Sequence, residues 1–152
     1  MVKRSNAVLV FLILLLFPCL AFAINPLPDN FNGLKFGVKM PAGFKITEKA
    51  PFDVVYYVNP NETATEYFGF SISNIEYSSC HGKFFEVNFN IVGGNMENVV
   101  SFFTEKSGVK SAAAKSSTYS FDNRVYLILV TGKDKNVHVT ITSSKYGSCL
   151  AP

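Results

Sequence analysis

The clearest alternation of hydrophobic and polar residues in the chain begins at Phe85. Apolar residues occupy every second position from Phe85 to Ile91, and polar residues lie between them. A strand with one buried face has this period of two. The pattern therefore predicts a half-buried strand that needs an apolar partner on one side.

The period changes after Gly93-Gly94. Met96, Val99, Val100 and Phe103 fall at positions i, i+3, i+4 and i+7, which form one stripe of a helix. Asn95 suits an N-cap and Gly108 suits the residue after the helix, so the helix is expected at about 96–107. The strand and this helix are expected to share one core.

The remaining chain is predicted to be mostly strands separated by turns. The segment 24–32 is expected to be extended with little structure of its own, and 109–117 to be a strand or irregular. A parity switch near Ser73-Asn74 predicts a β-bulge within the strand at 66–77. The other predicted strands are Leu34–Met40 and Phe44–Thr47 (as a hairpin), Phe52–Val58, Ser116–Phe121, Arg124–Thr131 and Val137–Ile141.

The run Val125–Val130 is apolar at every position, which is typical of a central strand covered on both faces. A single helix cannot cover both faces of a sheet, so it is expected on one. The predicted fold class is α+β, with a twisted antiparallel sheet of six to eight strands and one main helix packed on one face.

The first 23 residues have the features of a secretory signal peptide. Lys3 and Arg4 precede the apolar run 7–16, and Ala21-Phe22-Ala23 offers small residues before a cut. Cleavage after Ala23 would leave one domain, 24–152, and the formal charge of +3 would fall to +1 once Lys3 and Arg4 are lost. We expect a secreted or periplasmic protein with no transmembrane segment after the leader is removed.

Two cysteines, Cys80 and Cys149, remain in the expected mature chain. An exported protein with an even number of cysteines usually pairs them, so a Cys80–Cys149 disulfide is predicted. The competing interpretation is a reactive Cys80 thiol beside His81. We disfavour it because a catalytic Cys–His pair is set by spatial geometry rather than by adjacency in sequence.

Signals for catalysis or for cofactor and metal binding are weak. A zinc site usually takes three or four ligands, and the chain has two histidines, His81 and His138. His138 falls on the expected outward face of the last strand. No phosphate-binding glycine loop and no run of basic residues for nucleic acid is found. We assign no catalytic, metal or cofactor residues and predict no nucleic-acid partner.

Surface aromatic residues favour a binding role. Phe84 and Tyr126 fall on the parity opposite to the presumed core, and Tyr67 and Tyr77 are candidates for the same surface. The alternative is that these residues belong to a second covered face. The favoured function is an exported, non-catalytic module that binds a protein or envelope component, including a factor secreted by a pathogen. The alternative is a small secreted hydrolase or ligand-binding enzyme whose site lacks a sequence motif.

The order of elements resembles that of the PsbP-like fold family. An N-terminal hairpin (LKFGVKMPAGFKITE), several strands, a helix (NMENVVSFF) and closing hairpins (STYSFDNRVYLILVTGKDKNVHVTIT) follow one another. The resemblance implies an accessory or binding protein without catalysis, and it transfers no individual functional residue. A cystatin-like arrangement of one helix on a sheet is the alternative.

Overall fold

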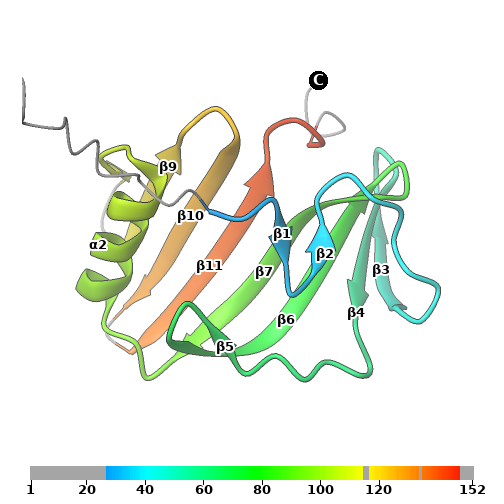
Figure 1. Ribbon diagram of the computed structural model, residues 1–152, viewed down its shortest axis with the longest axis horizontal. Helices are drawn as coiled ribbons and strands as arrows, with labels where there is room; N and C mark the ends of the chain where they lie inside the picture. Colours follow the sequence, from blue (N-terminus) through cyan, green and yellow to red (C-terminus); the bar gives the residue numbers. More distant parts are fainter. Residues whose placement is uncertain (1–26, 115–116, 134, 148–152) are drawn as a thin grey trace, which may run out of the picture.

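The computed structural model describes residues 27–114, 117–133 and 135–147. The predicted leader and Cys149 lie outside these ranges. Within these ranges the fold is α+β, as predicted, with an antiparallel sheet and one main helix (Figure 1). Along the sheet the strands are ordered β3 (Lys45–Ala50), β4 (Val54–Val58), β6 (Phe70–Cys80), β7 (Lys83–Val92), β11 (Asn136–Ser143), β10 (Tyr126–Lys133), β9 (Thr118–Asp122) and β8 (Ala112–Ala114).

Two segments cover the same face of this sheet. The helix α2 (Met96–Ser107) packs on β9 and β10, and the small hairpin of β1 (Asn30–Phe31) and β2 (Leu34–Lys35) lies over the middle of the sheet (Figure 1). Val99 and Phe103 from the helix and Phe31 from the hairpin join one hydrophobic core with the inward residues of the sheet. The other face carries paired polar side chains of β7 and β11 and a second, smaller hydrophobic cluster around Phe85.

The predicted bounds and capping residues of the helix are confirmed. The Asn95 side chain accepts a hydrogen bond of 2.8 Å from the Glu97 backbone N–H, which satisfies one of the free donors of the first turn. Gly108 has a left-handed backbone with φ of 69°, as is common after a helix. The apolar stripe faces the core, where Phe103 packs on Phe121 at 6.1 Å between ring centroids.

The predicted bulge in β6 is confirmed. Its pairing with β7 shifts register between Ser73 and Glu76, and Asn74 has a φ of 53°. The strand itself starts later than predicted, because Glu66–Tyr67 forms a separate strand, β5, which folds back on Phe70 and Ser71. The chain therefore makes a tight turn at Phe68-Gly69 inside the predicted strand.

The predicted N-terminal hairpin is wrong. Leu34–Lys35 pairs with Asn30–Phe31, and β3 pairs with β4. The turn between β1 and β2 is Asn32-Gly33, with positive φ at both residues, which suits the twist of a two-residue hairpin. Phe31 is only 1% exposed. The segment expected to lack structure therefore contributes a core residue.

The apolar run at 125–130 is not covered on both faces. Tyr126, Ile128 and Val130 are buried against the core, whereas Val125 is 55% exposed and Leu127 36% exposed. The strand β10 lies between β11 and β9, near the end of the sheet occupied by the helix. Because α2 covers only one face there, the alternate residues of the run remain accessible to solvent.

Candidate functional site

Three of the four predicted surface aromatics lie in the core. Phe84 is 0% exposed, Tyr77 1% and Tyr126 6%, so the proposed surface made of these residues is wrong. For Phe84 the cause is a second register shift between β6 and β7, at Ser78 and Ser79, which turns Phe84 to the core and Phe85 to the opposite face. Phe84 stacks on Phe36 at 4.6 Å.

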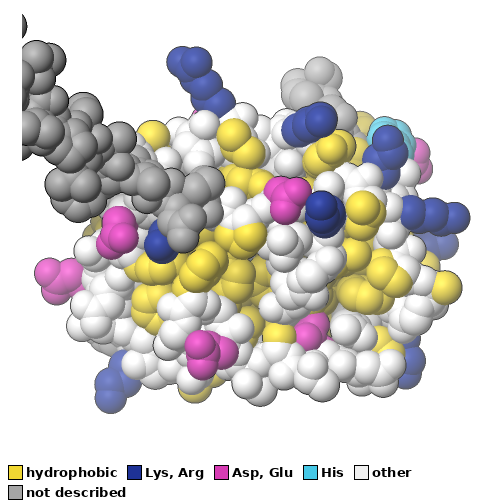
Figure 2. Space-filling model, in the orientation of Figure 1, with side chains coloured by type: hydrophobic (Ala, Val, Ile, Leu, Met, Phe, Trp, Pro, Cys, Tyr) yellow, Lys and Arg dark blue, Asp and Glu magenta, His cyan; other side chains and the backbone are white. Residues whose placement is uncertain are grey.

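The fourth residue, Tyr67, is half-buried and contacts a partly exposed aromatic cluster at the edge of the core. We call this cluster the aromatic site. It comprises Tyr67, Phe68, Phe70, Phe102 and Lys106. Three of these residues come from the β5–β6 hairpin and two from α2. Figure 2 shows hydrophobic side chains gathered on this face of the molecule, beside the helix.

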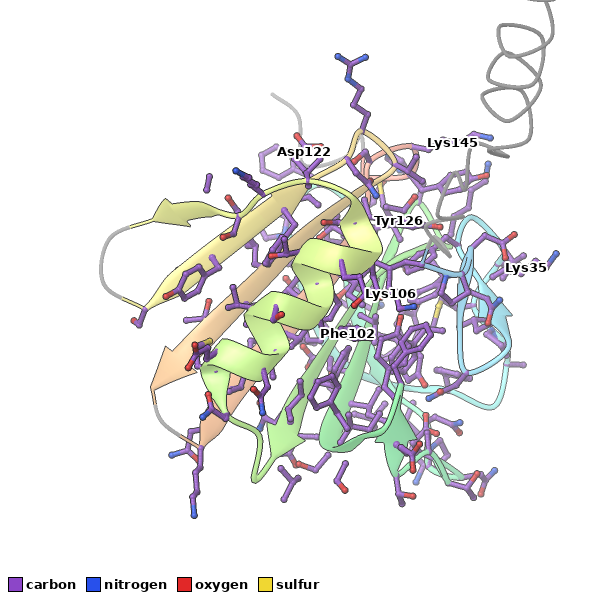
Figure 3. The ribbon with its side chains drawn as sticks, turned by 60° about the vertical axis from the view of Figure 1, so that its left-hand side comes forward. Lys35, Phe102, Lys106, Asp122, Tyr126 and Lys145 are labelled. Carbon is purple, nitrogen blue, oxygen red and sulfur yellow. The ribbon has the colours of Figure 1, made fainter. Side chains whose placement is uncertain are left out.

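The rings of the aromatic site contact one another closely. Phe68 lies 4.6 Å from Tyr67 and 5.3 Å from Phe102 between ring centroids, and Phe70 lies 5.4 Å from Phe102. Phe102 and Lys106 are one helical turn apart on the same side of α2 (Figure 3). The Lys106 Nζ is 6.0 Å from the Phe68 ring centroid and 5.9 Å from that of Phe102. A cation at this distance from two rings is held electrostatically.

Tyr67 ties the site to the core. Its ring lies 5.0 Å from Phe31 and 5.3 Å from Phe89. Burial, and next the nearby Tyr126, raise the pKa of the Tyr67 hydroxyl well above its usual value. A tyrosine hydroxyl is neutral at physiological pH even at its ordinary pKa, so the inner wall of the site carries no negative charge from Tyr67.

Phe68 is the outermost ring and its backbone is unusual. The side chain is 45% exposed, and φ is +50° at Phe68 and +84° at Gly69. A bulky residue rarely adopts positive φ, and two-residue turns of this kind favour Asn-Gly. The fold thus accepts local strain at a position where the side chain is largely outside the core. Such strain is common where a side chain serves a functional contact.

The opposite face of the sheet carries a polar ladder rather than a pocket. The Thr142 hydroxyl donates to Glu86 Oε2 at 2.8 Å, and the Thr140 hydroxyl donates to Asn88 Oδ1 at 2.6 Å. His138, on its predicted exposed position, lies 2.9 Å from Asn90 Oδ1 through Nδ1. These side chains satisfy one another across β7 and β11, which is a sufficient structural role for them.

Three carboxylates, Glu48, Glu76 and Glu86, adjoin this ladder. Partial burial, and next the charges of Glu48 and Glu86, raise the pKa of the Glu76 carboxyl. Burial and the same group of carboxylates also raise the pKa of Tyr56. Within the described residues, no three His, Cys, Asp or Glu side chains gather closely enough to hold a metal ion.

Three of the pockets formed by the described residues are open to solvent, and the described lining of each includes at most one carboxylate. A pocket of about 740 Å³ lies at the start of α2 beside Glu97, and one of about 440 Å³ lies beside His138. The third, about 490 Å³, contains Glu62, which accepts a hydrogen bond from the Tyr77 hydroxyl. The linings of these three pockets do not supply the paired carboxylates or the His–Cys–carboxylate set that the hydrolase alternative needs.

The predicted disulfide remains a prediction because Cys149 lies outside the described residues. Cys80 is expected from the sequence within a turn at 78–83, but it is the last residue of β6, directly before the turn at His81-Gly82. It is 3% exposed, in a small cluster with Val54 and Phe85. The adjacent His81 is engaged elsewhere, since its Nδ1 lies 3.0 Å from Asp53 Oδ2.

Comparison with known proteins identifies no relative. No family model matches the chain, and neither a curated protein nor a solved structure matches it. The resemblance to the PsbP-like fold family therefore stays a prediction. In the part of the chain that the structure describes, no helix is long and apolar enough to cross a membrane.

The sequence held one signal for the aromatic site. Phe68-Gly69 follows the pattern of a residue and a glycine at a hairpin turn, as Asn32-Gly33 and His81-Gly82 do. The alternation of the surrounding residues concealed it, because Phe68, Phe70 and Ile72 share one parity. The approach of Phe102 and Lys106 from the helix depends on tertiary packing and has no local signature.

Proposed function

We propose that this protein is an exported, non-catalytic binding domain whose aromatic site receives an apolar side chain of a partner protein. The observation that carries the proposal is Phe68, a partly exposed aromatic side chain on a strained turn. Rigid aromatic residues supply contact area at a low entropic cost, and they are enriched among residues that dominate binding energy.

Lys106 adds a chemical preference to the site. Its ammonium group lies beside the rings of Phe68 and Phe102 and forms no ion pair with a carboxylate of the described residues. A partner that places an acidic side chain next to its apolar anchor would pair with Lys106 as the anchor packs on Phe68. We therefore expect a partner surface with one aromatic or aliphatic residue beside an Asp or Glu.

The disulfide and the export signal belong to the same proposal. Tyr146 packs against the cluster that contains Cys80, and Gly147 follows next to Phe85. Cys149 is three residues beyond Tyr146, and three residues reach roughly 10 Å. The course of the chain thus supports a Cys80–Cys149 bond. Intact-mass measurement of the native protein, before and after reduction, tests the bond and the cleavage after Ala23 together.

Photocrosslinking tests the binding function. A photoreactive benzoyl-phenylalanine replaces Phe68 in the full chain, which is exported by its native host and irradiated there. The control carries the same group at Val92, which is 56% exposed at the end of β7. We expect a discrete protein adduct from position 68 that position 92 does not give. Equal labelling at the two positions, or no adduct at 68, overturns the proposal.

A further inference from the structure

Three segments of the chain meet at the end of the sheet opposite to the aromatic site. They are residues 37–40, the β3–β4 turn at 51–53 and the β6–β7 turn at 81–82, and we call them the basic end. His81 joins two of them through its 3.0 Å contact with Asp53. The Met40 backbone N–H joins the third by donating to the Gly82 carbonyl at 3.1 Å.

Two lysines lie directly opposite each other in this region. Lys39 and Lys83 form an isolated antiparallel bridge. The flanking hydrogen bonds run from Met40 N to Gly82 O and from Phe84 N to Val38 O, so the lysines are a non-hydrogen-bonded pair. Side chains approach most closely in pairs of this kind, and like charges placed there are destabilising. Neither lysine forms an ion pair with a described carboxylate.

The lysines of the basic end are far apart in the sequence and lie close together only in the folded chain. Lys49 lies next to the last residue of β3 and adds a third exposed cation near the β3–β4 turn. The carboxylate in that turn, Asp53, is held by His81. Figure 2 shows dark blue side chains and a histidine together at the right-hand end of the molecule, where both turns lie in Figure 1. Even with the negative charge of Asp53 counted against them, the three lysines leave the basic end with a net positive charge.

An exposed apolar side chain lies in the β3–β4 turn of the basic end. Phe52 is 79% exposed, the highest value among the exposed large hydrophobic residues described, and Val38 nearby is 40% exposed. The φ of Phe52 is +62°, so this second bulky residue also occupies a backbone region that such residues avoid. A projecting ring lacks the surrounding contacts that a buried anchor has in a rigid interface, and it suits a soft surface into which it can insert.

We infer that the basic end docks on a membrane surface that contains anionic phospholipid. Lysines near such a surface are attracted to it electrostatically, and an apolar side chain can enter the boundary between headgroups and acyl chains. The inference concerns a surface separate from the aromatic site and stands without the proposed function. Docking by the basic end would orient the protein on the membrane, because β6 runs from Phe70 at the aromatic site to Cys80 at the basic end. Eleven strand residues span roughly 35 Å, so docking leaves the aromatic site pointing away from the lipid.

Vesicle binding of the mature protein tests the inference. Phosphatidylcholine vesicles with and without phosphatidylglycerol are sedimented with the wild type and two double variants of equal charge change. The Lys39→Glu/Lys83→Glu variant should lose at least about 25-fold in partitioning, since each basic residue contributes roughly fivefold at such a surface. The Lys45→Glu/Lys110→Glu control, with exposed lysines outside the basic end, should keep most of the binding.

A fluorescence measurement separates docking by this end from diffuse attraction. The chain contains no tryptophan, so Phe52→Trp and Val92→Trp each introduce a single reporter. We expect the emission of the tryptophan at position 52 to shift to shorter wavelength on anionic vesicles, and that at position 92 to stay unchanged. Binding that does not require phosphatidylglycerol overturns the inference. An equal loss of vesicle binding in the two double variants also overturns it, and so does an equal emission shift at positions 52 and 92. Either result would be expected if the charges bind an acidic protein instead of a membrane.

Discussion

Replacing Phe68 by Asn separates the stability of the fold from the function of the aromatic site. Residues 68 and 69 are the two central residues of the turn between β5 and β6, and both have positive φ. Asn followed by Gly is the favoured sequence for such a turn, and this chain already uses it at Asn32-Gly33. The variant therefore relieves the backbone strain of the turn and at the same time removes the partly exposed ring.

Two opposing terms set the size of the effect on stability. A left-handed backbone costs a residue such as Phe about 1–2 kcal/mol, most of which Asn avoids. Phe68 contacts the rings of Tyr67 and Phe102, and an aromatic pair contributes about 0.5–1.5 kcal/mol beyond burial. Because the Phe68 side chain is 45% exposed, removing its ring costs only part of the stabilisation that removing a fully buried ring would cost. We expect the free energy of unfolding of the variant to lie within about 1 kcal/mol of the wild type.

Urea denaturation of both proteins, followed by circular dichroism, measures this difference. Phe68→Leu is the matched comparison, since it shortens the side chain but keeps the strained turn, and it should be less stable than Phe68→Asn. A loss well above about 2 kcal/mol in Phe68→Asn would show that the ring is a structural element, which refutes our interpretation of the strain.

Other changes test the remaining structure. Phe31→Ala should cost about 3–5 kcal/mol, because it empties a fully buried site, whereas Phe52→Ala should be nearly neutral; similar denaturation midpoints for both would remove Phe31 from the core. Asn95→Ala should lower stability by about 1 kcal/mol through loss of the helix cap, and a thermal melt matching the wild type would contradict the capping role. Partial burial and the neighbouring carboxylates disfavour the ionised form of Glu76 in the folded protein and raise its pKa. The free energy of unfolding should therefore fall as the pH rises above the ordinary carboxyl pKa of 4.5. Glu76→Gln should weaken that fall and raise the melting temperature at neutral pH, and an unchanged pH profile would exclude Glu76 as its source.

Elements with a sustained period were predictable from the sequence. The helix has an uninterrupted apolar stripe and a capping residue at each end, and these local signals fixed both of its ends. The strands β7 and β11 alternate over most of their length, and they lie side by side at the centre of the sheet. In β6 the parity switch predicted the bulge at Asn74, because a bulge moves the side chains that follow it to the other face of the sheet.

Features set by distant partners were not predictable. Phe31 is buried because Tyr67, Tyr77 and Phe89 surround it, and its own neighbours in sequence include prolines and polar residues. Phe84 faces the core because its pairing with β6 shifts, which no pattern within 83–92 records.

Both proposed surfaces illustrate the same limit. Phe68 meets Phe102 and Lys106 across more than thirty residues of chain, and Lys39 meets Lys83 across more than forty. A search for runs of basic or aromatic residues misses such sites. What the sequence does record at each of them is a phenylalanine at a turn, where the backbone favours glycine or asparagine.

The most direct test of the account is the affinity of the Phe68→Asn variant for the partner protein that crosslinks at position 68. Isothermal titration of the purified partner into wild type and variant gives both dissociation constants, and a thermal melt of each confirms the fold. The account predicts binding weakened by about 30-fold or more while the variant stays fully folded at the titration temperature, as expected for a central aromatic anchor. Equal dissociation constants for the two proteins would contradict it.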